Sequence, residues 1–166
     1  MAVAKAHRLD AAAALLQAYS ASARINQYLV ERLSPAVWRA PAPPPKGRTV
    51  AALVAHMHNC ALRYLERTAP EVPVPAELDR HRVTQKQAAR ALGAKRKAVL
   101  AIVGAALEDN DKIVGSPHRA AEFLAYYMAH DAHHRGQIVQ QARELGHPIS
   151  RQTMIGMWQW SARVKE

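Results

Sequence analysis

Residues 130–137 read His130-Asp131-Ala132-His133-His134-Arg135-Gly136-Gln137 and place three histidines within five residues. They lie inside a longer segment, Ser116 to Leu145, whose apolar spacing predicts one long helix. At 3.6 residues per turn, His130 and His134 stand one above the other on the same face of that helix. Two imidazoles one turn apart can share a metal ion, as paired histidines do in helical zinc motifs.

The helical phase indicates which histidines face the interior. At about 100° per residue, His134 lies near the middle of an apolar stripe and His130 at its edge, whereas His133 lies roughly 110° from the centre. The stripe consists of Phe123, Tyr127, Ile138, Gln141 and Leu145. Burying two unligated imidazoles would leave several polar atoms without partners, so the pattern favours a metal site that needs a third ligand from elsewhere.

Hydrophobic periodicity predicts three more long helices, at about Leu9–Leu33, Thr49–Arg67 and Thr84–Leu107. Two proline-rich stretches, 41–47 and 69–75, separate them and cannot continue a helix. A shorter helix at about Arg151–Val164 is expected to lie against the others. The sequence therefore predicts an all-α fold, a four-helix bundle with a short C-terminal helix, in a single domain of residues 1–166.

Local signals mark where these helices begin and end. Thr49 is the expected N-cap of the second helix, and Thr84 opens a capping box with Gln87 at the start of the third. Ser116-Pro117 is expected to open the fourth helix, with a proline at the first helical position. Gly146, followed by Pro148, is expected to close it.

The second helix contains two candidates for the missing ligand, His56 and His58. They flank its apolar stripe on opposite sides, so the phase does not choose between them. His56 shares its side with Leu53 and Cys60, which favours it slightly. Bundles build metal sites from inward side chains on different helices, so a histidine of this helix can join the pair on the fourth.

Composition limits the other readings. The chain has 23 basic and 13 acidic residues, a formal charge of +10, which suits an anionic substrate or nucleic acid. The charge is scattered, however, and its one cluster, Lys95-Arg96-Lys97, is expected to be a solvated helix face, so nucleic acid is not favoured. Cys60 is the only cysteine, which excludes an internal disulfide.

Nothing in the sequence predicts a membrane protein. No apolar run reaches transmembrane length. The apolar residues 11–16 are interpreted as part of the first helix and not as a signal peptide. A cytoplasmic protein is the default expectation.

Two segments together resemble a known family. Thr49-Val50-Ala51-Ala52-Leu53-Val54-Ala55-His56, with His130-x-x-x-His134-Arg135-Gly136-Gln137, resembles the DinB/YfiT-like metalloenzymes, the damage-inducible family and not the DNA polymerase of that name. The resemblance covers nearly the whole chain and includes Asn26. It implies up-down-down-up connectivity, a zinc or nickel ion held by His56, His130 and His134, and a homodimer. Relatives with demonstrated chemistry are thiol-dependent transferases or isomerases, which implies a small-molecule substrate and a low-molecular-weight thiol such as bacillithiol or mycothiol.

A three-histidine site leaves positions open on the metal, as catalytic sites do, where a bound water or thiol can be activated. Arg135 beside it could hold an anionic substrate, although a solvated position is expected. Further candidate contacts, each better explained singly by ordinary packing, are Tyr127, Asp131, His133, Gln137 and Gln141. In order, the sequence favours a metal-dependent thiol transferase or hydrolase, a non-catalytic metal-binding stress or interaction protein, and a nucleic-acid-binding protein.

Overall fold

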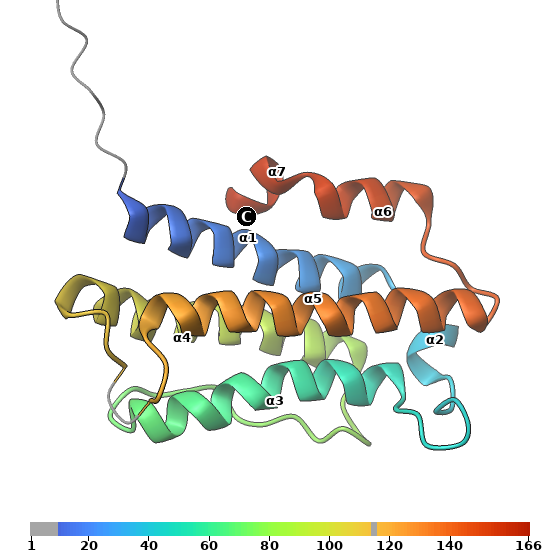
Figure 1. The fold of residues 1–166 in the computed structure, drawn as a ribbon. Coiled ribbons are helices and arrows are strands. Elements are labelled where there is room, and N and C mark those ends of the chain that lie inside the picture. The colour runs from blue at the N-terminus through green and yellow to red at the C-terminus, as the bar shows by residue number, and fades with distance from the viewer. Residues whose placement is uncertain (1–9, 114–115) are drawn as a thin grey trace, which may run out of the picture.

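The fold is known from a computed structural model of the chain, which describes residues 10–113 and 116–166. Four long helices, α1, α3, α4 and α5, lie side by side as a four-helix bundle (Figure 1). The helices within the described ranges are α1 (Ala11–Arg32), α2 (Pro35–Arg39), α3 (Val50–Thr68), α4 (Gln85–Asp109), α5 (Ala120–Glu144), α6 (Arg151–Trp158) and α7 (Trp160–Val164). The expected all-α bundle is confirmed; Leu9, the expected start of the first helix, lies outside the described residues.

The connectivity is up-down-down-up. In Figure 1, α1 and α5 run in one direction, and α3 and α4 run in the other. The connection between α3 and α4, residues 69–84, travels back along the bundle, so that these two consecutive helices are parallel. This arrangement brings α3 and α5 together as antiparallel neighbours.

The interior consists of two apolar clusters separated by a polar level. On α3 the first cluster takes residues 50–57 and the second takes residues 61–65; on α5 the clusters lie at 138–142 and 120–127. Between them, at the middle of the bundle, lie buried polar side chains: Asn26, His58, Lys95, Asp131 and His134. The apolar clusters supply the burial that stabilises the bundle, and they hold these polar groups in a rigid setting.

Several predicted helix ends are confirmed. The Thr49 hydroxyl accepts a hydrogen bond from the Ala52 amide at 3.1 Å, and Thr84 and Gln87 form the expected capping box. Gly146 follows α5 with φ of 76°, a left-handed conformation that glycine adopts at little cost.

The predicted start of the fourth helix is wrong. α5 begins at Ala120, and Ser116 forms a local turn in which its hydroxyl accepts from the His118 amide at 3.0 Å. The first free amides of α5 donate instead to Asp111, from Ala120 to its carbonyl and from Ala121 to its carboxylate, each at 3.1 Å. Asp111, nine residues before Ala120, therefore caps α5 in place of Ser116, and sequence spacing alone does not reveal this partner.

Two short helices also differ from expectation. Pro35–Arg39 forms α2, capped by Ser34, where the sequence indicated only the end of the first helix. The C-terminal segment is two helices, because Gln159 has φ −81° and ψ 65°, outside the helical region. No helix within the described residues combines the length and apolarity that crossing a membrane requires.

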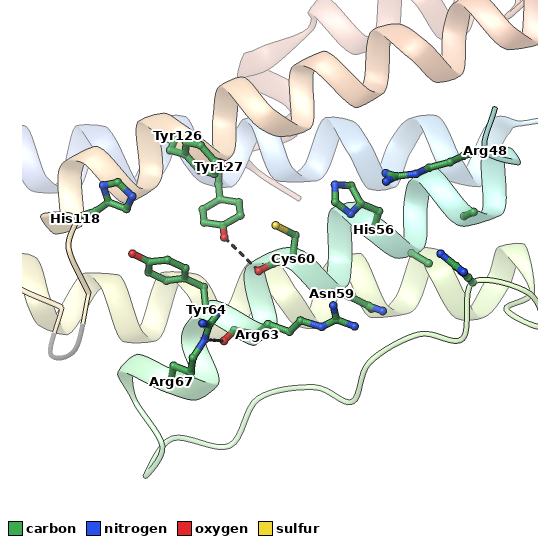
Figure 2. A pocket seen from close by; sticks show the side chains of 13 residues that line it. Arg48, His56, Asn59, Cys60, Arg63, Tyr64, Arg67, His118, Tyr126 and Tyr127 are labelled. Carbon is green, nitrogen blue, oxygen red and sulfur yellow. Dashed lines mark hydrogen bonds between the residues drawn. The ribbon is translucent and has the colours of Figure 1, made fainter. Parts of the chain in front are cut away.

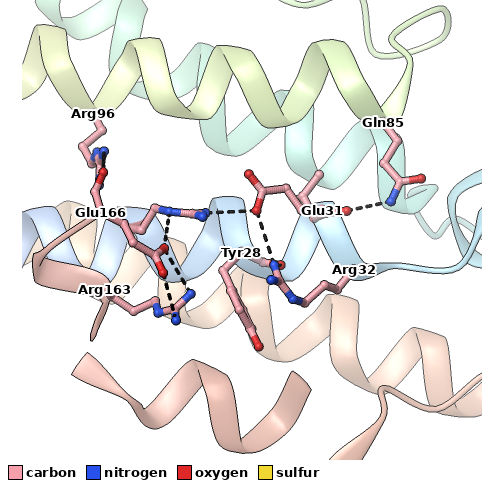
Figure 3. A network of polar contacts seen from close by, with 9 residues as sticks. Tyr28, Glu31, Arg32, Gln85, Arg96, Arg163 and Glu166 are labelled. Carbon is pink, nitrogen blue, oxygen red and sulfur yellow. Dashed lines mark hydrogen bonds and ion pairs between the residues drawn. The ribbon is translucent and has the colours of Figure 1, made fainter. Parts of the chain in front are cut away.

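The two C-terminal helices pack on α1 through a polar and cationic network (Figure 3). The ring of Tyr28 lies between two guanidinium groups, with Arg32 Cζ 3.6 Å and Arg163 Cζ 4.3 Å from its centroid. Arg163 also pairs with Glu166 at the end of the chain. At the C-terminal end of α1, Gln85 of α4 donates to Val30 O and to the carbonyl of the C-cap residue Leu33, at 2.7 and 2.9 Å.

Gly156 on α6 allows this close approach, and its replacement by alanine is expected to lower the free energy of unfolding by about 1–3 kcal/mol. An added Cβ would overlap the Tyr28 hydroxyl and lie 3.0 Å from Cε1 of a ring that two arginines hold in place. Chemical denaturation measures the change. Gly104→Ala is the matched control: its Cβ would meet only Leu16 at 3.7 Å, so this change in a helix interior should be neutral or stabilising. Equal effects of the two substitutions would contradict the prediction.

Candidate metal centre

Three histidines from two helices meet at the middle of the bundle. His56 of α3, and His130 and His134 of α5, each offer a ring nitrogen, and these nitrogens lie within 4.8 Å of one another. The Nε2 atoms of His56 and His130 are 3.3 Å apart. All three side chains are shielded by the bundle but not sealed: His134 is buried, and His56 and His130 are half-buried.

The donor set fits a divalent metal. Zinc–nitrogen bonds of about 2.0–2.1 Å in tetrahedral geometry separate neighbouring ligand nitrogens by about 3.3 Å, which matches the His56–His130 spacing. The set as a whole spans up to 4.8 Å, so the rings must shift inward for all three to share one ion. His130 Nδ1 donates to Asp131 Oδ1 at 3.1 Å, and His134 Nδ1 donates to Gln137 Oε1 at 2.7 Å. With a metal bound, these bonds would favour the tautomer in which each Nε2 keeps its lone pair for the ion.

Asp131 is held in turn by a buried network from three helices. Its Oδ2 accepts from Asn26 Nδ2 on α1 and from Lys95 Nζ on α4, both at 2.9 Å. Lys95 Nζ also donates to the carbonyl of Met57 at 3.0 Å. Burial by itself raises the pKa of Asp131, but Lys95 and His130 outweigh it and hold the pKa below its ordinary value. The carboxylate therefore stays charged and holds the His130 ring in one orientation.

Lys95 corrects the sequence interpretation. The sequence predicts that Lys95 belongs to a solvated cluster with Arg96 and Lys97, yet its side chain is 1% exposed. Only Lys97 of the three is exposed. The position of Lys95 among the apolar residues of its helix, with Leu92 and Val99 nearby in the sequence, is the signal that could have identified it.

The remaining candidates from the sequence lie outside the three-histidine cluster. His133 is exposed and faces away from the core, as the phase predicts. Tyr127 is buried and donates its hydroxyl to the Cys60 carbonyl at 3.2 Å, and Gln141 donates to the Arg48 carbonyl at 3.3 Å. Arg135 is not solvated as expected, because it is partly buried and donates to Asn26 Oδ1.

The alternative third ligand, His58, lies apart from the cluster. It is fully buried, and its Nε2 donates to the Ala76 carbonyl at 3.0 Å. Its role is to tie the connection between α3 and α4 to the bundle, which is the usual place of a core histidine. The geometry thus selects His56 where the helical phase left both residues open.

A sequence model of the DinB family matches residues 5–161, nearly the whole chain. The chain belongs to the DinB family. No curated protein and no solved structure gave a match. Membership of the DinB family agrees with the all-α bundle and with the sequence resemblance, and the three-histidine cluster is compatible with metal binding.

In this DinB-family protein, the three histidines differ in their affinity for a proton. Burial, together with His134 and Arg48, lowers the pKa of His56 to about 4, whereas the hydrogen bond to Asp131 raises the pKa of His130 to about 9. Burial lowers the pKa of His134 as well. Near neutral pH the His130 imidazolium therefore donates from Nε2 to the unprotonated His56. A metal ion would take the place of that shared proton.

A pocket of about 410 Å³ opens onto His56 (Figure 2). Cys60 and Tyr127 border it beside the histidine, and the His130 side chain lowers the pKa of the Cys60 thiol. Its other lining side chains include four arginines, Arg48, Arg63, Arg67 and Arg80. Sequence reasoning missed these arginines, because two lie in loops without periodicity and the other two, on α3, have the spacing of any solvated helix face. A second pocket, of about 360 Å³, is lined by His134 and Gln137.

Proposed function

We propose that this protein is a metal-dependent enzyme that transfers a low-molecular-weight thiol to an electrophilic substrate, with zinc or nickel at His56, His130 and His134. The observation that carries the proposal is the pocket of about 410 Å³ that borders His56. A structural metal site is closed by four protein ligands, whereas a catalytic one has three ligands and an open side. Here the ring nitrogens come from three histidines, and one of these, His56, borders a space large enough for a small molecule.

When bound there, a divalent ion lowers the pKa of a thiol or water so that its deprotonated form exists near neutral pH. The chain supplies the rest. Asp131 and Gln137 orient two of the imidazoles, and Lys95 and Asn26 keep the Asp131 carboxylate charged and fixed. The pocket walls place an electrophile beside the thiol. A water in place of the thiol would make the same site hydrolytic.

A non-catalytic metal-binding role is the second candidate, and one observation favours it. Among the described residues that line the pocket there is no aspartate or glutamate, so no carboxylate stands ready as a general base. A divalent ion would lower the pKa of a bound thiol, so that solvent water could take its proton without such a base, and for this reason we prefer transfer to storage or sensing. Nucleic-acid binding is not proposed, because these four arginines line a concave pocket and not an extended face.

Thiol transfer is tested with zinc- or nickel-loaded protein and a panel of thiols, including bacillithiol, mycothiol and cysteine, against chromogenic aromatic electrophiles. We expect turnover above the uncatalysed rate with at least one thiol. His134→Ala should reduce kcat/KM by more than about a hundredfold, because the loss of a ligand exceeds the usual effect of losing an outer partner.

His133→Ala is the matched control, since it removes an exposed imidazole next to the cluster and should leave the rate unchanged. Equal rates in the His134 and His133 variants would refute the thiol-transferase proposal. Full metal binding without turnover on any thiol would favour the non-catalytic role.

A further inference from the structure

A hollow of about 370 Å³ lies where the two C-terminal helices meet the bundle. Helices α6 and α7 lie together along α1, as Figure 1 shows, and the hollow opens between them and α5. It shares no lining residue with the two pockets that border His56 and His134. A molecule bound in this C-terminal hollow would therefore occupy a different space from a ligand at the histidine cluster.

The walls of the C-terminal hollow are apolar and open to solvent. Trp158 is 78% exposed and Trp160 is 40% exposed, although large indole rings usually lie covered. Two methionines face the same space, and their unbranched, flexible side chains adapt to ligands of irregular shape. Apart from one arginine, the lining consists of Ile25 of α1, Ala132, Gly136 and Val139 of α5, Met154, Met157 and Trp158 of α6, and Trp160 of α7.

The one charged residue of the lining is Arg135 of α5. Its side chain is partly buried, and among the described residues its hydrogen-bond partner is Asn26, whose Oδ1 accepts from Nη1. No carboxylate of the described residues lies within ion-pair distance of this guanidinium. A guanidinium carries several further N–H donors in a planar fork, which match the two oxygens of a carboxylate. The hollow thus combines an apolar wall with a single cation that has donors to spare.

We propose that the C-terminal hollow is a binding site for a medium-chain aliphatic carboxylate. The carboxylate accepts hydrogen bonds from Arg135, which complements it in charge and geometry. The alkyl chain lies between the methionines and the indoles of Trp158 and Trp160, where each CH₂ group that leaves water tightens binding by about fourfold. This site goes beyond the proposed function and does not depend on it, because none of its residues belongs to the histidine cluster.

Binding is measured by isothermal titration calorimetry of the full chain with octanoate. Three other probes separate charge from chain: acetate keeps the carboxylate, 1-octanol keeps the chain without charge, and octylammonium reverses the charge. We expect saturable octanoate binding, binding of 1-octanol weaker by about tenfold or more, and none of acetate or octylammonium at the same concentrations. Hexanoate, which is shorter by two CH₂ groups, should bind about tenfold more weakly than octanoate.

Tryptophan fluorescence reports where octanoate binds. The chain has three tryptophans, and of these Trp38 is buried whereas Trp158 and Trp160 line the C-terminal hollow. Octanoate should shift the emission to shorter wavelength, because the two exposed indoles lose contact with water. Replacing both exposed tryptophans by phenylalanine should remove the shift, while calorimetry still detects binding.

Gly136→Leu fills the C-terminal hollow without a change of charge, and it should weaken octanoate binding by about tenfold or more. A Cβ at this glycine would meet no atom within 4 Å, and leucine is the better helix former, so the variant should fold. Ala125→Leu is the matched control, since this exposed alanine lies on the same helix outside the hollow, and it should bind octanoate as the wild type does. Arg135→Gln should reduce the affinity for octanoate to that for 1-octanol.

The absence of saturable octanoate binding would overturn the proposal. So would 1-octanol binding as tight as that of octanoate, because Arg135 would then not select a carboxylate. Equal octanoate affinities of Gly136→Leu and Ala125→Leu would place the acid elsewhere on the protein. Sedimentation velocity tests the other occupant of such a surface: a dimeric wild type that becomes monomeric with Gly136→Leu would show that a second copy of the chain covers the hollow, which also overturns the proposal.

Discussion

Lys95→Met is expected to lower the free energy of unfolding by about 3–5 kcal/mol, the usual cost of removing one partner of a buried ion pair. Both side chains of the Lys95–Asp131 pair are almost fully buried, and their charged atoms lie 2.9 Å apart. Without the ammonium group, the Asp131 carboxylate remains in the bundle core with its charge uncompensated, and the Met57 carbonyl loses its donor. Chemical denaturation followed by far-UV circular dichroism gives the change.

Two further variants test whether the loss of the buried ion pair causes the fall in stability. Lys97→Met, on the exposed face of the same helix, should change stability by no more than about 0.5 kcal/mol. The double variant Lys95→Met with Asp131→Asn should recover part of the loss, because it removes both buried charges and keeps one acceptor oxygen, for either Asn26 or His130. If Lys95→Met costs no more than Lys97→Met, Lys95 is not the counter-ion of Asp131.

The sequence predicts the four long helices of this fold but only some of their ends. Four helices and their buried faces follow from apolar periodicity, because each helix must bury one stripe. Their ends follow only where the capping residue is adjacent, as at Thr49, Thr84 and Gly146. At α5 the cap is Asp111, which the chain brings back from the preceding connection. Such a partner depends on tertiary structure.

The sequence likewise predicts only some of the residues of the metal site. His130 and His134 share one helix, so their common face follows from helical geometry alone. The choice of His56 over His58 depends on how α3 is rotated against α5, which no single helix specifies; the resemblance to a known family supplied it. Lys95 and Asp131 each lie on the buried side of a helix, and a lysine and an aspartate in two apolar stripes could have suggested a buried pair. Arg48 and Arg80 lie outside the helices, where no periodic pattern exists to place them.

His56→Ala is expected to abolish tight metal binding while leaving the bundle folded. The side chain is half-buried and no hydrogen bond besides that with His130 Nε2 ties it to the described residues, so its removal should cost little stability. The remaining pair on α5 would hold a metal with two protein nitrogens in place of three, and we expect the affinity to fall by more than about a hundredfold, beyond the usual effect of an outer partner. Elemental analysis after loading and dialysis, together with a competition titration against a chromogenic chelator, measures both stoichiometry and affinity.

His133→Ala and His58→Gln serve as controls, because each removes an imidazole outside the cluster. His133 is exposed, so its variant should keep both its stability and its metal. His58→Gln should lower the stability, because His58 donates to the Ala76 carbonyl, but this variant should also keep its metal. The contrast decides between two physical explanations of the 3.3 Å contact between His56 and His130. If the contact is only a hydrogen bond, a proton lies between the two nitrogens, and none of the variants changes the metal content of the protein. A coordination site requires both nitrogens to face one ion, and then His56→Ala loses the metal while the two controls retain it.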